Sequence, residues 1–162
     1  MQASTQESKS MSRGIISIYW GDEAKLPIER LKASVKKFHP NLPHEIIKVE
    51  APSDDPSSLN QKAAMLELSP FEETLFLDLD TVVLGNLDFG FEKAKQFGMA
   101  IAICEAPWGK RYPKIFSGDE VEYNTGVIFF TKQTKAFFDK WKELATSIDS
   151  AIVAVGDKGI YP

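Results

Sequence analysis

Two aspartates, Asp78 and Asp80, are set into the longest apolar stretch of the chain, with Leu75-Phe-Leu77 before them and Val82-Val-Leu84 after them. Apolar residues at successive positions predict a strand that is covered on both faces, as in a parallel sheet. A carboxylate inside such a run is costly unless a partner balances its charge. Because side chains two positions apart on a strand point to the same side, we expect the two carboxylates to converge.

Two converging carboxylates offer the oxygen ligands that a hard divalent cation prefers. The alternative interpretation is that the acids cap the following turn or lie on a solvated rim, since a bare Asp-x-Asp pattern is common. The two histidines of the chain, His39 and His44, both precede the acids and lie in a loop or at the start of a strand. The sequence therefore predicts two metal ligands, Asp78 and Asp80, and no third.

Length and composition indicate one ordinary globular domain, because the chain has 162 residues, of which 43% are hydrophobic and 26% charged. The net charge of -4 gives no support to a nucleic-acid or anionic-membrane partner. No apolar run approaches the roughly 18 residues of a membrane span. The single cysteine, Cys104, excludes an internal disulfide and favours a reducing, cytoplasmic location. We expect residues 1–13 to be a disordered polar tail and residues 14–162 to form the domain.

Strands and helices alternate along the chain, which predicts an α/β domain with a mostly parallel sheet. The predicted strands lie over residues 14–20, 45–49, 75–84, 99–104 and 127–130, and 151–155 could begin another. The predicted helices carry the stripes Ile28, Leu31, Val35, Phe38; Leu59, Ala63, Leu66; and Phe137, Trp141, Leu144, Ile148, with a short helical piece over 91–97.

The fold prediction places the two acids where such domains bind ligands. In open α/β sheets, ligands bind outside the carboxyl ends of the strands. Asp78 and Asp80 follow Leu75-Phe-Leu77 at one such end, and Tyr19 and Trp20 close the first strand in the same way. We therefore expect these residues to share one edge of the sheet.

Three elements together resemble a known family: Lys62 in a predicted helix, the segment Pro70–Leu87, and the segment Tyr123–Phe130. From Ile15 to about Trp141 the chain is similar to the glycosyltransferases of the GT-A fold, nearest to the glycogenin-like and family 8-like enzymes. In that family a helical lysine precedes a strand that ends in Asp-x-Asp, and an Asn-x-Gly turn follows. The resemblance implies a three-layer α/β/α fold with a mostly parallel central sheet.

The resemblance also implies an activity: metal-dependent transfer of a sugar from a nucleotide-diphosphate donor, such as a UDP-sugar, to an acceptor that the sequence does not identify. Asp78 and Asp80 would hold Mn²⁺ or Mg²⁺, which would neutralise the charge that develops on the departing diphosphate. No catalytic residue is assigned. The donor-binding residues that the resemblance implies are Tyr19, Lys62, Asp78, Leu79, Asp80, Asn124 and Gly126.

Enzymes of this family usually continue past the Asn-x-Gly strand, with an Asp-Gln-like segment and often a later histidine. Here Gly156-Asp-Lys-Gly159 is only faintly similar to that segment. The chain thus resembles the nucleotide-binding part of a transferase without the usual C-terminal part. Such a chain would expose an apolar sheet edge or face, so we expect self-association into a homo-oligomer.

Two other functions fit parts of the sequence. In a phosphatase of the haloacid-dehalogenase type, Asp78 would be the nucleophile and Asp80 the general acid. That motif normally lies near the start of the chain, however, and the downstream acidic pair is not evident here. The short length also fits a non-catalytic module that binds a nucleotide sugar without transferring it.

Overall fold

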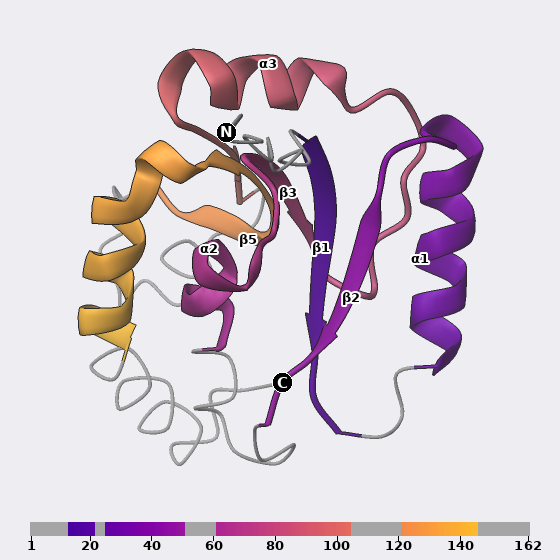
Figure 1. Ribbon diagram of the computed structural model, residues 1–162, viewed down its shortest axis with the longest axis horizontal. Helices are drawn as coiled ribbons and strands as arrows, with labels where there is room; N and C mark the ends of the chain where they lie inside the picture. The colour runs from indigo at the N-terminus through magenta and orange to yellow at the C-terminus, as the bar shows by residue number, and fades with distance from the viewer. Residues whose placement is uncertain (1–12, 22–24, 51–60, 105–120, 146–162) are drawn as a thin grey trace, which may run out of the picture.

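The structure is a computed structural model that describes residues 13–21, 25–50, 61–104 and 121–145. A five-stranded sheet in the order β2-β1-β3-β5-β4 forms its centre (Figure 1). The strands are β1 (Arg13–Tyr19), β2 (His44–Lys48), β3 (Glu73–Leu77), β4 (Met99–Ile103) and β5 (Tyr123–Thr131). The helices are α1 (Lys25–Phe38), α2 (Met65–Leu68), α3 (Asp88–Phe97) and a helix over 135–145, called here the C-terminal helix.

Apolar residues fill both faces of the central strands, so the predicted three-layer arrangement is confirmed. On one side lies the α1-side cluster, whose buried residues are Ile15, Leu31, Val35, Leu75, Leu77, Val83 and Phe91. On the other lies the α2-side cluster, whose buried residues are Ile16, Ile18, Met65, Leu66, Phe71, Phe76, Ile128, Phe130 and Phe138. Helix α1 therefore covers one face of the sheet, and α2 with the C-terminal helix covers the other (Figure 1).

The sheet is mostly parallel, as predicted, with one strand reversed. Strand β1 pairs in parallel with both β2 and β3, whereas β5 runs antiparallel to its neighbours β3 and β4. The reversal brings the start of β5 beside the end of β3, where Leu77 is level with Val127. The Asn-x-Gly segment and the two acids, far apart in the chain, therefore meet at the same edge of the sheet.

Local boundaries differ from the predictions at several points. Strand β3 ends at Leu77, and Val82 and Leu84, expected to be buried, are 42% and 83% exposed. Helix α3 begins at Asp88, ahead of the predicted 91–97. Of the helix expected over Leu59, Ala63 and Leu66, the described part is a 3-10 turn over 61–64 that continues into the four residues of α2.

Both ends of the chain lie largely outside the described residues. Of the expected tail, only Arg13 is described, and it begins β1 and pairs with Glu73 at 2.7 Å. The predicted strand over 151–155 also lies outside the described ranges. Within those ranges, no helix is both long and apolar enough to cross a bilayer.

We predict that His44 makes the stability of the fold depend on pH. Burial, and then the nearby charge of Lys32, lower the pKa of His44 from 6.5 to about 4. Its Nε2 lies 3.1 Å from Ser17 Oγ, and its Nδ1 is buried without a partner. As the pH falls from 6.5 towards 4, the unfolded chain gains a proton that the folded chain excludes, so the stability present above pH 6.5 is lost.

The measurement is urea unfolding of the wild type and His44→Gln at pH 7.5 and pH 5. Carboxylates titrate in both proteins, so the comparison isolates the imidazole. The wild type should lose about 1 kcal/mol more than the variant, after allowance for solvent screening of a partly exposed ring. Equal losses in the two proteins would contradict the prediction.

Candidate functional site

An ion pair joins two of the residues that the sequence singled out. Lys62 Nζ donates to Asp78 Oδ2 at 2.6 Å, and the two side chains are only 13% and 29% exposed. Asp78 is the first residue after β3, and Lys62 lies in the 3-10 turn before α2. The carboxylate at the end of a buried strand thus has the cationic partner that its low-dielectric surroundings require.

The two acids lie in a tight turn rather than on the strand itself. Thr81 N donates to Asp78 O at 3.1 Å, which closes the turn directly after β3. The side chain of Leu79 packs against the α1-side cluster, whereas Asp80 is exposed. The alternation of side chains along a strand therefore does not apply to Asp78 and Asp80. Within the turn, the carboxylate of Asp78 is paired with Lys62, whereas Asp80 is exposed.

Helix α1 fixes the segment that follows this turn. Val83, which is buried in the α1-side cluster, donates its N–H to Ser34 Oγ at 3.0 Å. Ser34 Oγ in turn donates to Leu31 O at 2.8 Å, within the same helix. The segment after β3 is thereby fixed although it forms no regular element. Neither contact was predicted from the sequence, because a serine in an amphipathic helix looks like an ordinary solvated residue.

The start of β5 completes the site. Asp78 N donates to Gly126 O at 2.9 Å, and Gly126 N donates to Asn124 Oδ1 at 2.7 Å. A Cβ atom on Gly126 would lie 3.0 Å from both Asp78 Oδ2 and Asn124 Oδ1. The glycine thus allows the two polar side chains to approach the backbone closely, which gives the Asn-x-Gly pattern a steric explanation.

Tyr19 reaches the same edge of the sheet. It is the last residue of β1 and is partly exposed. In the parallel pairing of β1 and β3, Ile16 is level with Phe76. Tyr19 follows Ile16 by three residues and Asp78 follows Phe76 by two residues, so both residues lie just beyond the last paired position. The structure therefore brings Tyr19, Lys62, Asp78, Asn124 and Gly126 to the carboxyl end of β1 and β3.

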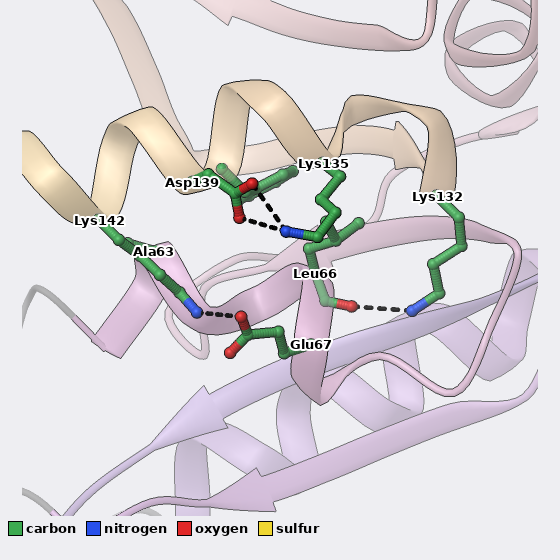
Figure 2. A pocket seen from close by; sticks show the side chains of 8 residues that line it. Ala63, Leu66, Glu67, Lys132, Lys135, Asp139 and Lys142 are labelled. Atoms are coloured by element: carbon green, nitrogen blue, oxygen red, sulfur yellow. Dashed lines mark hydrogen bonds and ion pairs between the residues drawn. The ribbon is translucent and has the colours of Figure 1, made fainter.

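A second lysine supports the segment that carries Lys62. Lys132 Nζ donates to Leu66 O at 2.8 Å (Figure 2). It also donates to Ser69 O at 2.7 Å, so it satisfies carbonyl groups of α2 and of the residue that follows it. Lys142 of the C-terminal helix pairs with Glu67 in the same region, beside a cavity of about 200 Å³. The sequence did not indicate these roles, because a lysine after a strand usually lies in solvent.

The site contains hard oxygen donors and a cation but few candidate metal ligands. In the part of the chain that the structure describes, no group of three or more His, Cys, Asp or Glu side chains could hold a metal ion. His39 Nε2 accepts from Leu87 N at 2.9 Å, and His44 is held beside Ser17. Among the described residues of this edge, Asp80 and the second oxygen of Asp78 are the carboxylate groups that Lys62 leaves unengaged.

Comparison with solved structures identifies the fold. The chain resembles mouse xyloside xylosyltransferase 1 (TM-score 0.54, 15% identity, 91% of this chain and 76% of that one). It also resembles the glycosyltransferase GlyE of Streptococcus pneumoniae (TM-score 0.54, 15% identity, 93% and 40%). A third similar structure is the galactosyltransferase LgtC in complex with donor and acceptor sugar analogues (TM-score 0.52, 13% identity, 83% and 65%).

These similarities show that the chain has the GT-A fold predicted from the sequence. The chain spans 65% of the length of LgtC and 40% of the length of GlyE, so both of these proteins extend well beyond the shared part. A scan of the sequence itself finds no matching protein family and no matching curated protein.

We predict that Lys132 stabilises the protein well beyond what a surface lysine contributes. Burial lowers the pKa of Lys132, with the charge of Glu72 opposing the shift. Substitution of Lys132 by Met would leave two carbonyl groups without their charged donor, which should cost about 1.5–3 kcal/mol of unfolding free energy. The measurement is chemical denaturation.

The matched control is Lys135→Met, which removes an exposed ion pair with Asp139 from the wall of the same cavity (Figure 2). Exposed pairs contribute little, so this variant should unfold close to the wild type. Equal destabilisation by the two substitutions would show that Lys132 has no special role.

Proposed function

We propose that this chain transfers a sugar from a nucleotide-diphosphate donor, such as a UDP-sugar, to an acceptor. The observation that carries the proposal is the Lys62–Asp78 ion pair at the carboxyl end of β3, in a fold shared with glycosyltransferases. Ligands of open α/β sheets bind at this edge. Departure of the sugar leaves additional negative charge on the nucleoside diphosphate, so the binding site needs positive charge at a fixed position.

Lys62 supplies that charge within the protein. Its ammonium group is largely buried, and Asp78 holds it at 2.6 Å. A lysine that is already held in place loses little conformational freedom when the donor binds. The entropic cost of binding the diphosphate is therefore lower. Lys132 contributes indirectly. Its hydrogen bonds to Leu66 O and Ser69 O fix α2, which continues directly from the turn that carries Lys62.

Asp78 and Asp80 would hold Mn²⁺ or Mg²⁺ beside the diphosphate. The residues fit such an ion in part, because Asp80 is exposed and Lys62 engages only Oδ2 of Asp78. When bound, the ion would add Lewis-acid neutralisation of the departing phosphate oxygens. Phosphate oxygens and water would complete the coordination, as is usual for Mg²⁺ in nucleotide sites.

The remaining residues at the edge would shape the donor pocket. Tyr19 would lie near the nucleoside, and Asn124, which is exposed, would present its amide N–H₂ group while its Oδ1 accepts from Gly126. Leu79 would act by anchoring the turn that carries the acids, because its side chain packs into the α1-side cluster.

The two alternative functions are distinguishable. The fold comparisons do not favour a phosphatase, and Asp78, which would be its nucleophile, is engaged by Lys62. A non-catalytic binding module would bind the donor but neither hydrolyse nor transfer its sugar. Release of radiolabelled sugar from the donor, measured with and without Mn²⁺, separates that module from a transferase.

We predict that Asp80 is needed for binding of the nucleotide with its metal. Isothermal titration of the full chain with UDP and Mn²⁺ should give an affinity for Asp80→Ala that is weaker than that of the wild type by about tenfold or more. The loss should be much smaller when UDP is titrated without the metal, because the substitution removes a metal ligand.

The control variant is Asp139→Ala, which removes an exposed carboxylate of the C-terminal helix that pairs with Lys135 rather than with a residue of the turn after β3. It should bind as the wild type does. Equal affinity of the wild type and Asp80→Ala for UDP with Mn²⁺ would overturn the proposal.

We also predict that a single methyl group on Gly126 weakens donor binding without unfolding the protein. In Gly126→Ala the new Cβ would lie 3.0 Å from Asp78 Oδ2, so the carboxylate would have to shift by a few tenths of an ångström away from its position beside Lys62. We expect about tenfold weaker binding of UDP with Mn²⁺, measured by the same titration.

Gly85→Ala is the matched control, since a Cβ at that position meets nothing within 4 Å. Circular dichroism should show both variants folded. If Gly126→Ala and Gly85→Ala bound UDP equally well, the close packing of Asp78 against β5 would have no part in binding.

A further inference from the structure

A cavity of about 200 Å³ lies between the α2 segment and the C-terminal helix, and the proposed sugar transfer makes no use of it. Three apolar side chains that line it, those of Ala63, Leu66 and Phe138, are at most 8% exposed. The charged residues that line it are Glu67, Lys132, Lys135, Asp139 and Lys142. A buried apolar part beside a few charged groups is the usual composition of a site for a small molecule.

The charged groups around this cavity carry a net positive charge. Lys132, Lys135 and Lys142 outnumber the two acids, although the whole chain has a net charge of -4. Lys132 begins the 3-10 turn before the C-terminal helix, and the other two lysines lie on that helix, facing the same cavity. Figure 2 shows the three side chains between this helical segment and α2. The cavity therefore favours an anion in a chain that is acidic overall.

Lys132 has one N–H donor beyond those that its hydrogen bonds use. Its Nζ donates to the carbonyl oxygens of Leu66 and Ser69, whereas an ammonium group has three N–H donors. Among the residues that the structure describes, Lys132 forms no ion pair, although the charge of Glu72 also acts on it. An acceptor that carries negative charge would complete the surroundings of this ammonium group.

The other two lysines are held by carboxylates that a stronger anion can displace. Lys135 pairs with Asp139 on the same helix, and these side chains are 71% and 52% exposed. Lys142 pairs with Glu67 of α2. Exposed ion pairs contribute at most about 1 kcal/mol, so little is lost when a lysine changes its partner. A phosphate monoester carries a charge of about -1.5 to -2 and three acceptor oxygens, so it competes for lysines more strongly than a carboxylate.

We propose that this cavity binds a small phosphate monoester, with the phosphate at the three lysines and the apolar group against Ala63, Leu66 and Phe138. An apolar cavity of about 150 Å³ can hold a benzene ring, so a cavity of about 200 Å³ has room for an apolar group of that size. Ala63 directly follows Lys62, so the ligand would contact the segment that carries a residue of the candidate site. The inference does not depend on the proposed function.

The test is an NMR titration of the isotope-labelled full chain with phenyl phosphate in the absence of metal ions. We expect saturable shifts that are largest for the amides of Glu67 and Asp139, with a dissociation constant of about 1 mM. Shifts that are largest at Asp78 and Gly126 would mean that the phosphate binds at the carboxyl end of β3 instead. That result, or no saturation up to about 10 mM, overturns the proposal.

Inorganic phosphate tests the role of the apolar group. It should shift the same amides but bind about tenfold more weakly than phenyl phosphate, because it leaves the apolar lining of the cavity uncovered. Equal affinity for the two compounds would mean that the apolar lining takes no part in binding, and would contradict a site for a monoester.

Two substitutions test the role of the charged groups. Lys135→Met removes one ammonium group and only an exposed ion pair, so the variant should fold and bind phenyl phosphate about tenfold more weakly. Asp139→Asn should bind about threefold more tightly, because it removes a competing carboxylate.

Lys140→Met is the matched control for Lys135→Met. It removes an exposed ion pair with Glu143 from the same helix, but Lys140 does not line the cavity, so binding should be as in the wild type. Equal affinities of Lys135→Met and Lys140→Met, or no gain in Asp139→Asn, would show that the lysines of the cavity do not hold the phosphate and would overturn the proposal.

Discussion

The carboxylate of Asp78 at the end of a strand buried on both faces is the constraint on which the candidate site depends. Such a group must be paired, and Lys62 pairs with it at 2.6 Å. The pair ties the segment before α2 to the end of β3, so the cation is held at the carboxyl end of a strand, the edge where open α/β sheets bind ligands. Lys132 and Lys142 of the C-terminal helix also contact α2, through Leu66 O and Glu67.

The candidate site also depends on the direction of β5. Because β5 runs against β3, its first residues lie beside the last residues of β3, and Gly126 accepts the N–H of Asp78. In a parallel arrangement the Asn-x-Gly segment would lie at the opposite edge, far from the acids. The register shift between Ile101 and Ala102 occurs in the same part of the sheet, where β4 pairs with the start of β5. Irregular pairing of this kind often accompanies a binding site, because it redirects individual side chains.

The sequence predicted those features that depend on local pattern. The apolar run of β1 and the stripe of Leu31 and Val35 on α1 both follow from periodicity, as does the α/β class. The direction of β5 did not follow, since a strand has the same pattern in either direction. The exposed positions of Val82 and Leu84 were also missed, because burial depends on what covers a segment. The partners of Lys132 are distant carbonyl groups, which no spacing in the chain reveals.

The proposed sugar transfer requires that the carboxyl end of β3 bind the diphosphate of a nucleotide sugar. A crystal structure of the full chain with UDP and Mn²⁺ tests it most directly, because anomalous scattering locates the metal independently of the nucleotide. We expect phosphate oxygens within hydrogen-bonding distance of Lys62 Nζ and a manganese peak beside Asp78 and Asp80. A nucleotide bound at another edge of the sheet, with Lys62 and Asp78 still paired and untouched, would contradict it.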